Sequence, residues 1–514
     1  MVPTDVVRTR AREAVADFAV KALALRPRPR ATGNRSVIAF DDFRQTVRRY
    51  RPSNLLPALA ELALVGAQEP EKRTELMVAI PPWAIATAAR ESVLWGNEYR
   101  RDDVDGEALR RIMSAHARIA EIDTEKGDDQ LIDVLTRVAY EQFPYQASAA
   151  AEVSRSQALL VDGLGEAGAR TFTLQTADRL LGAPLGQMVG ATFMLHALAS
   201  GRGGWIDLSA FDDPSFDVIF RTWPREVLDL RAEQLSVTFD EFKQRYEAAP
   251  KAPPGNARFD YNPLVDVPLL RMGDGRLLAP QPSLIMRTVT PEVLFYRGVE
   301  EFGSQPFGTD MGLLTQHYVG KQLRLLEPSV TLFPEVEYWV GKSRKDSTDW
   351  FLVFESLVVM IEVKSARYGW FAQAAGDGYK DRAHSPLVKG VDQLITTAGL
   401  LAEGRPEFAH IPTDRPLVGI LVTAEPFYMA NTPWVRDEVL SRGDIPITVA
   451  SLSDIERMVC LSTDDVERRL LKMINDPERM MHPLDVGMDL VGEVLRNPIL
   501  EAAWDGYPWP GDRQ

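Results

Sequence analysis

Hydrophobic residues recur every three to four positions through most of the first half of the chain. This spacing is typical of helices that bury one face and leave the other to water. It runs through residues 4–25, 53–66, 81–101, 106–122 and 128–143. No unit repeats with a fixed period, so the pattern does not indicate a solenoid. We therefore predict a mostly α-helical N-terminal region over residues 1–249.

The helical pattern stops where prolines accumulate. The sequence APKAPPGNARFD spans residues 249–260 and has the composition of a linker, so we predict a domain boundary at residues 250–255. Beyond it, PLLRMGDGRLLAP (residues 268–280) predicts a β-hairpin that turns at residues 273–275. We expect residues 256–307 to lead from this hairpin into a second domain.

Helix and strand patterns alternate in the C-terminal half, which is typical of an α/β domain. Helices are predicted at residues 312–326 and 385–401, and strands at residues 330–340, 416–429 and 446–459, the last leading into a helix. Helical spacing continues to about residue 503 and is followed by a loose tail. We expect an α/β core over residues 308–460 and further helices over residues 461–514.

The sequence STDWFLVFESLVVMIEVKSAR, at residues 347–367, predicts a β-hairpin with charges at its open end. Residues 357–361 are an unbroken hydrophobic run, as in a strand that is covered on both faces. Because side chains alternate along a strand, Glu362 and Lys364 project from the same face. A tight turn brings Asp349 opposite Glu362. Such charges cost several kcal/mol to bury unless they pair with each other or bind a metal.

These three side chains suggest metal-dependent chemistry on a phosphate. Two converging carboxylates offer the hard oxygen ligands that Mg²⁺ prefers, and the lysine supplies positive charge to a phosphate and its attacking water. The acid, the acid-x-lysine triplet and the hairpin together resemble the PD-(D/E)xK, or restriction-endonuclease-like, nuclease superfamily. The resemblance covers roughly residues 308–459 and implies a nuclease core with a mixed central sheet flanked by helices.

The resemblance also implies a role for each residue of the set. Asp349, Glu362 and the backbone carbonyl of Val363 would hold Mg²⁺ or Mn²⁺. Lys364 would orient the attacking water and stabilise the phosphate in the transition state. Gln393, on the helix predicted after the triplet, would help to position the water or the backbone, as a glutamine does in several branches of the superfamily.

One position departs from the superfamily pattern. Many relatives carry a glutamate on the first helix of the core, where this chain has Gln316. Either fewer acids hold the metal, or Glu335 or Glu337 takes that place. Asp346 is the alternative to Asp349 if the register of the hairpin differs.

The composition excludes several other classes of protein. The chain has 514 residues, 45% of them hydrophobic and 25% charged, which is ordinary for a soluble protein of two or three domains. Cys460 is its single cysteine, so an internal disulfide framework and cysteine zinc clusters are excluded. No segment has the apolar length of a membrane span, and the N-terminus lacks a signal-peptide pattern. We expect a cytoplasmic protein that does not contact a membrane.

The net charge of −15 argues against nucleic-acid binding by the surface as a whole, but binding is local. Basic residues flank the acid-x-lysine triplet on both sides: Lys342, Arg344, Lys345, Arg367, Lys380, Arg382 and Lys389. They are either a nucleic-acid footprint or solvated surface. Four aromatic residues lie among them and either stack on bases or belong to the core: Trp350, Tyr368, Trp370 and Phe371.

These patterns lead to one expected function and one alternative. We expect a metal-dependent endonuclease that hydrolyses phosphodiester bonds, with DNA as the first substrate. Fusions of a helical region with such a nuclease are frequent in bacteria, which suggests defence against foreign DNA. The region 1–249 is expected to serve a partner protein or self-association. The alternative is a catalytically inactive nucleic-acid-binding or scaffold protein, in which Glu362 and Lys364 form only a structural ion pair.

Overall fold

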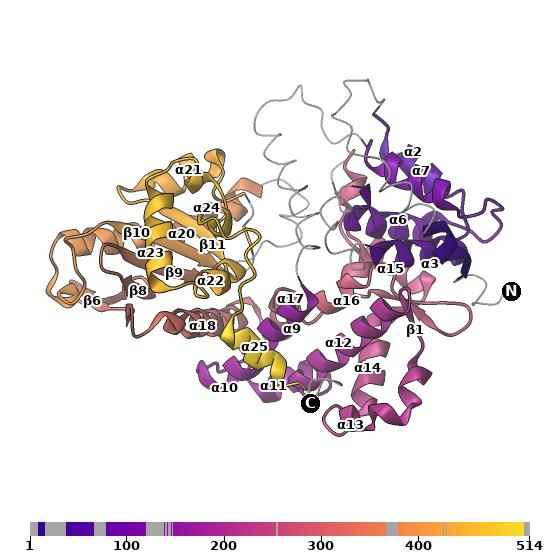
Figure 1. Cartoon of the computed structure of the whole chain (residues 1–514), viewed down its shortest axis with the longest axis horizontal. Helices are drawn as coiled ribbons and strands as arrows, with labels where there is room; N and C mark the ends of the chain where they lie inside the picture. The colour runs from indigo at the N-terminus through magenta and orange to yellow at the C-terminus, as the bar shows by residue number, and fades with distance from the viewer. Residues whose placement is uncertain are drawn as a thin grey trace. The chain divides into compact units, whose positions relative to one another are not determined.

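Figure 1 shows the computed structural model of the chain, which folds as two compact units. Unit 1 comprises residues 1–153, 183–293 and 507–514, and unit 2 comprises residues 154–182 and 294–506. The structure describes residues 9–15, 37–65, 79–119, 138, 141, 145, 148–252, 255–365, 379–424, 426, 427 and 429–507. Both units combine segments that are far apart in the sequence.

The N-terminal part of unit 1 is helical, as its hydrophobic spacing predicts. Four helices bury their hydrophobic faces in one shared core: α2 (Phe40–Val47), α3 (Pro52–Ala63), α6 (Pro82–Trp95) and α7 (Gly106–His116). The predicted helix at 4–25 is described only at 9–15, where it is helical, and most of the one at 128–143 lies outside the described residues. Helix α9 (Ala149–Ser156) begins in unit 1 and ends in unit 2.

The described residues of unit 1 include five more helices: α12 (Leu185–Gly201), α13 (Asp217–Phe220), α14 (Arg225–Leu235), α15 (Phe239–Ala248) and α16 (Ser283–Arg287). α12 is hydrophobic on all sides because α14, α16 and a short strand pack around it. Across the described parts of the chain, no helix is both long and apolar enough to cross a membrane.

A small sheet in the order β1-β4-β3-β2 completes unit 1. Its strands are β1 (Trp205–Ile206), β2 (Ser236–Val237), β3 (Leu269–Arg271) and β4 (Leu277–Leu278). β3 and β4 form the predicted hairpin, and Met272 N donates to the carbonyl of Arg276 at 2.9 Å across its turn. The hairpin therefore packs with the N-terminal helices instead of leading into the second domain.

The division between the units does not fall at the predicted boundary, residues 250–255, because the chain on both sides of the prolines is tied into unit 1. The hydroxyl of Tyr246 donates to Asp260 Oδ2 at 2.7 Å. The buried Arg90 of α6 donates to the carbonyl oxygens of Ala257 and Asp260 at 2.9 and 2.6 Å. Three segments belong to units other than the prediction assigned: 154–182, 256–293 and 507–514.

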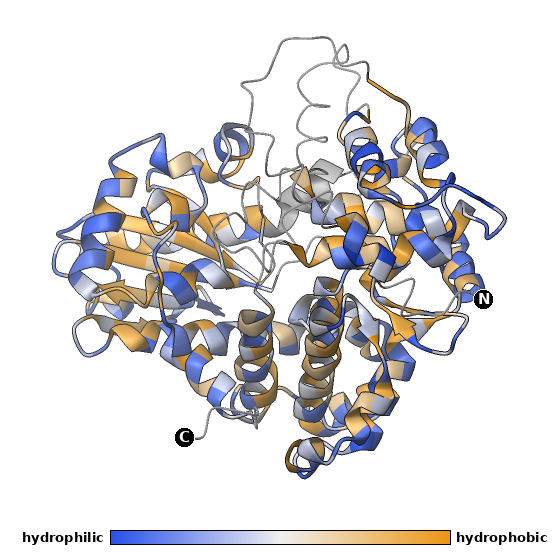
Figure 2. Ribbon diagram, turned by 45° about the vertical axis from the view of Figure 1, so that its right-hand side comes forward, coloured by the Kyte–Doolittle hydropathy of each residue, from blue (hydrophilic) through white to orange (hydrophobic). Residues whose placement is uncertain are grey.

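Unit 2 contains a five-stranded mixed sheet in the order β11-β10-β9-β8-β5. Its strands are β5 (Thr331–Pro334), β8 (Trp350–Val353), β9 (Val358–Lys364), β10 (Leu417–Thr423) and β11 (Ile447–Ser451). β9, β10 and β11 run parallel, whereas β8 is antiparallel to both β5 and β9. Figure 2 shows hydrophobic residues along most of this sheet. The mixed α/β class predicted for this half is confirmed.

Two long helices sandwich the sheet. α18 (Ser304–Leu323) covers the face that carries Trp350. Gly320 lies so close to this ring that an added Cβ would be 2.2 Å from Trp350 Cζ2. α20 (Tyr379–Ala402) covers the other face, where a Cβ added to Gly390 would meet Leu421 Cδ1 at 2.4 Å. Among its described residues, unit 2 also has the helices α10 (Gly163–Glu166), α11 (Leu174–Leu181), α17 (Pro291–Phe302, which begins in unit 1), α21 (Pro433–Glu438), α22 (Leu452–Met458), α23 (Thr463–Ile474), α24 (Leu484–Gly487) and α25 (Pro498–Asp505).

The single strand predicted at residues 330–340 is two strands. β5 ends at Pro334, and β6 (Glu337–Val340) pairs with β7 (Ser343–Asp346) in a separate hairpin. Ser347 closes the base of this hairpin, because its N–H donates to the carbonyl of Val336 at 3.0 Å and its Oγ accepts from Val336 N at 2.8 Å. The hairpin thus ends two residues before Asp349.

Candidate functional site

β8 and β9 form the predicted hairpin, and their register brings its two acids together. Trp350 pairs with Ile361, so Asp349 and Glu362, one residue further out, lie opposite each other at the open end. Asp349 Oδ2 accepts a hydrogen bond from Val363 N at 2.6 Å. Asp349 directly precedes β8, and its carboxylate therefore binds the backbone of β9 at the open end of the hairpin.

Lys364 completes the cluster from the same face of β9 as Glu362. Its ammonium donates to Glu362 Oε1 and also to Gln393 Oε1, the latter at 3.2 Å. Gln393 Nε2 donates to the carbonyl of Ser347 at 2.7 Å. A side chain of α20 thus joins the lysine on β9 to the segment that leads into Asp349. The structure brings together all four side chains that the sequence singles out.

Two threonines that the sequence analysis does not identify fix this end of β8. Thr348 N donates to Thr397 Oγ1 of α20 at 3.1 Å, and Thr348 Oγ1 donates to the carbonyl of Ile361 at 2.8 Å. Both threonines are buried. No local pattern marks them, because their contacts depend on how α20 packs on the sheet.

Glu362 is the most constrained group of the cluster. It is 1% exposed, and its Oε2 has no hydrogen-bond partner among the described residues. The Thr348 hydroxyl, which donates to the carbonyl of Ile361, lies near this carboxylate and lowers its pKa. Burial raises the pKa of Glu362, the charge of Asp349 raises it further, and Lys364 opposes both effects. Lys364 alone therefore does not fully compensate the buried carboxylate.

Asp349 has a similar electrostatic environment. Burial raises its pKa, while the hydrogen bond from Val363 N and the charge of Lys364 lower it. The charge of Glu335 adds to the upward shift. Two carboxylates that both resist ionisation form a site with an excess of negative potential, which favours a cation.

Glu335 is the third acid at this end of the sheet. β5 pairs with β8 up to Pro334 and Trp350, so Glu335 and Asp349 both adjoin the last pair in that register. Burial raises the pKa of Glu335. The alternative acid, Glu337, instead pairs with Arg344 at 2.6 Å on the β6–β7 hairpin. Within the described residues, no three acidic, histidine or cysteine side chains are close enough to hold a metal together.

Gln316 lies on the opposite side of the sheet. It belongs to α18, which packs on the face that carries Trp350. Glu362 and Lys364 project from the other face, toward α20. Gln316, where the sequence resemblance would place a further acid, is therefore not joined to the Glu362 cluster.

The basic residues around the triplet have different surroundings. Lys342 and Lys345 are exposed on the β6–β7 hairpin, and Lys389 is exposed on α20. Arg344 is held by Glu337 and Asp346. Trp350 is buried in the core and is not a stacking surface. The other members fall outside the described residues or have side chains that are not described: Arg367, Tyr368, Trp370, Phe371, Lys380 and Arg382.

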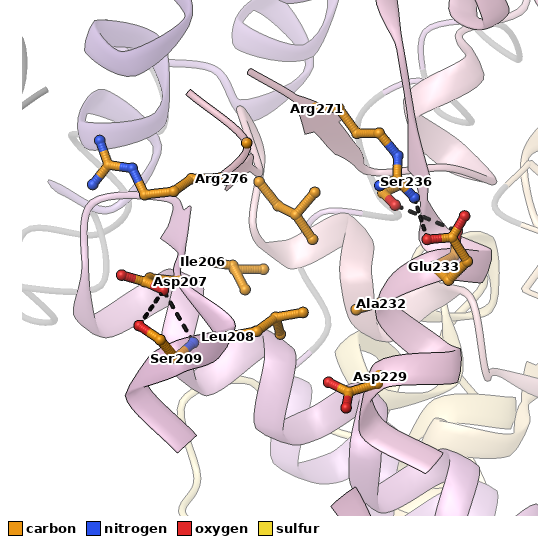
Figure 3. A pocket seen from close by; sticks show the side chains of 12 residues that line it. Ile206, Asp207, Leu208, Ser209, Asp229, Ala232, Glu233, Ser236, Arg271 and Arg276 are labelled. Atoms are coloured by element: carbon orange, nitrogen blue, oxygen red, sulfur yellow. Dashed lines mark hydrogen bonds and ion pairs between the residues drawn. The ribbon is translucent and has the colours of Figure 1, made fainter. Parts of the chain in front are cut away.

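Unit 1 contains a separate pocket of about 230 Å³ between β1, β4 and α14 (Figure 3). Arg271 and Glu233 form an ion pair at one end, and Arg276 pairs with a neighbouring aspartate. Asp207 accepts from both N and Oγ of Ser209. These charges satisfy one another, so the pocket presents no group poised for catalysis. No sequence motif marks it.

No family model, no curated protein and no solved structure matches this chain. Inferences about function therefore depend on the geometry of its own residues.

Proposed function

We propose that the cluster at the open end of β8 and β9 hydrolyses phosphodiester bonds in DNA with the help of a divalent metal ion. The observation that carries the proposal is the convergence of Asp349, Glu362 and Lys364, with Glu362 Oε2 buried and unpaired. Buried polar atoms are almost always satisfied. An unsatisfied carboxylate oxygen beside a second carboxylate is a binding position for a cation.

The donor set fits a hard divalent ion such as Mg²⁺ or Mn²⁺. Asp349 and Glu362 supply anionic oxygens. The carbonyl of Val363 points to the same side of β9 as its N–H, which Asp349 binds. A cation held by these groups would satisfy Glu362 Oε2 and offset the repulsion between the two carboxylates. When bound, it would activate water and polarise the phosphate.

Lys364 is suited to contact the substrate. Its side chain is 28% exposed, whereas its partner Glu362 is 1% exposed. In the structure the ammonium contacts Glu362 Oε1. With a metal ion bound to Glu362, the ammonium would be free to donate to a phosphate oxygen or to the attacking water. Gln393 keeps it in place, because its amide binds both Lys364 and the carbonyl of Ser347.

Incubation of the purified chain with plasmid DNA and with RNA tests the proposal. We expect nicking or linearisation of the plasmid with Mg²⁺ or Mn²⁺ and no cleavage in EDTA. Cleavage of RNA without cleavage of DNA would contradict the assigned substrate. Absence of cleavage of both nucleic acids with both metals would contradict the proposed function itself.

The direct contact between Lys364 and Glu362 favours a second candidate, a nucleic-acid-binding or scaffold protein without chemistry. In that case, removing one partner strands the other and costs about 3 to 5 kcal/mol, whether metal is present or not. Melting curves of the wild type, Glu362→Gln and Lys364→Ala with and without Mg²⁺ separate the candidates. Stabilisation of the wild type by Mg²⁺ supports the metal site. Metal-independent melting with both variants strongly destabilised supports the scaffold.

A further inference from the structure

Unit 1 carries a surface cluster of arginine and aromatic side chains where the end of α2 meets the loop after α6. Tyr99 is 92% exposed and Trp95 is 43% exposed, although large aromatic side chains are mostly buried in soluble proteins. We call the cluster the arginine–aromatic surface. Its members are Arg48, Arg49, Arg51, Trp95, Tyr99, Arg100, Arg101 and Arg111.

Contacts to the backbone fix the two segments side by side. Arg48 Nε donates to the carbonyl of Trp95 at 3.2 Å, and Arg51 Nε donates to the carbonyl of Arg100. A β-bridge joins residue 50 to residue 102. Arg48 and Arg51 therefore keep a defined position. The surface is preorganised, which lowers the entropy that a ligand must overcome.

The positive charge of the surface is only partly neutralised. Besides the Arg110–Glu107 pair, the segments that carry it (residues 48–51 and 95–111) hold six arginines and four acids. The acids are Glu98, Asp102, Asp103 and Asp105, of which Asp102 pairs with Arg49. Among the described residues, five of the six arginines have no carboxylate within salt-bridge distance: Arg48, Arg51, Arg100, Arg101 and Arg111. This is a local excess of positive charge on a chain whose net charge is −15.

We propose that the arginine–aromatic surface binds a single-stranded nucleic acid. The arginines would contact phosphates, and the ring of Tyr99 would stack on a base, as would the face of Trp95 that Arg44 does not cover. Charge complementarity selects a polyanion. Exposed rings beside arginines select one with unpaired bases over an acidic polypeptide, because base stacking on aromatic side chains contributes to affinity for any base. The inference gives unit 1 a binding role of its own, beyond the hydrolysis proposed for unit 2.

Fluorescence anisotropy of a labelled oligothymidylate, measured on the full chain in EDTA, tests this proposal without any cleavage. Arg100→Ala/Arg101→Ala should weaken binding at least about tenfold. It should also lower the slope of log Kd against log salt by about 0.7 for each phosphate that the variant no longer neutralises. Tyr99→Ala should weaken binding about tenfold with an unchanged salt slope, because it removes stacking and no charge.

The matched control is Arg110→Ala/Arg225→Ala. Both arginines lie in unit 1 and pair with nearby carboxylates, and the double change alters the net charge as much as the test variant does. The control should bind like the wild type, and circular dichroism should show all variants folded. Equal binding by the wild type and the surface variants would overturn the proposal. Competition by polyglutamate, together with wild-type binding by Tyr99→Ala, would also overturn it and indicate an acidic protein partner.

Discussion

At the level of single residues, burial decides the chemistry of Glu362. Its carboxylate receives one ammonium, from Lys364, but faces Asp349 and has an oxygen without a partner. A surface glutamate in an acid-x-lysine triplet has no such constraint. Glu241 and Lys243 on α15 provide the comparison, because Glu241 caps its own helix and Lys243 is exposed. The same acid-x-lysine sequence is therefore buried and constrained in the strand but exposed and unconstrained on the helix.

Glu362→Gln should flatten the pH dependence of stability in EDTA. The pKa of Glu362 in the folded chain lies above its usual value of 4.5, so the folded chain keeps a proton that the unfolded chain has released. The free energy of unfolding of the wild type should therefore fall, by about 1 kcal/mol or more, as the pH rises from 4.5 through the raised pKa. Urea unfolding at several pH values measures this change. The same slope in Glu362→Gln would show that another group titrates.

Glu335→Gln should weaken the binding of Mn²⁺ about tenfold, whereas Glu337→Gln should not change it. Glu335 adjoins the last pair of β5 with β8 and its charge acts on Asp349, while Glu337 pairs with Arg344 on the β6–β7 hairpin. Both variants remove one negative charge, so the difference reports position alone. Titration calorimetry gives the two affinities. A weaker affinity in Glu337→Gln than in Glu335→Gln would contradict the register argument.

At the level of elements, features that follow from local sequence patterns were predicted better than features that depend on contacts between distant segments. The β8–β9 hairpin, its turn and the exit into α20 follow from alternation, a hydrophobic run and helical spacing, and Asp349, Glu362, Lys364 and Gln393 converge as expected. The division of residues 330–340 into two strands depends on the pairing of β5 with β8, which no local pattern encodes. The place of Gln316 behind the sheet is equally non-local. Interactions between distant segments therefore limited the prediction.

Gly320→Ala should destabilise unit 2 by about 1 to 3 kcal/mol, because the added methyl group would overlap the ring of Trp350 at 2.2 Å. The matched control is Gly308→Ala on the same helix, where a Cβ meets no atom within 4 Å. It should stabilise the chain by up to about 1 kcal/mol through helix propensity. Denaturant unfolding compares the two variants. Equal effects would mean that α18 does not press on the sheet at Gly320.

At the level of the whole molecule, the chain passes repeatedly between its two units. Residues 154–182 leave the N-terminal half and fold with the C-terminal half. Arg155 in this segment donates to both carboxylate oxygens of Glu456 at 2.6 and 2.7 Å, and Tyr318 donates to the same carboxylate at 2.8 Å. A fragment that begins at residue 256 lacks Arg155. The domain boundary was not predictable from prolines alone, because buried Arg90 holds the chain beyond them.

Arg155→Met should therefore lower the free energy of unfolding of the full chain by about 3 kcal/mol, because Glu456 is 4% exposed and would remain charged without its arginine. Arg170→Met, an exposed position in the same segment, is the control and should change stability by less than about 0.5 kcal/mol. Thermal melting measures both. A loss of less than about 1 kcal/mol in Arg155→Met would show that residues 154–182 contribute little to unit 2.

The most direct measurement is the rate of plasmid cleavage by Lys364→Ala beside that of Lys243→Ala. Both variants remove the lysine of an acid-x-lysine triplet, one at the site and one on the surface of α15. With saturating Mg²⁺, we predict that Lys364→Ala lowers the rate at least about a hundredfold, as expected when a group that stabilises the transition state is removed, and that Lys243→Ala cleaves like the wild type. Equal cleavage by both variants, with the wild type active, would contradict a catalytic site at Asp349, Glu362 and Lys364.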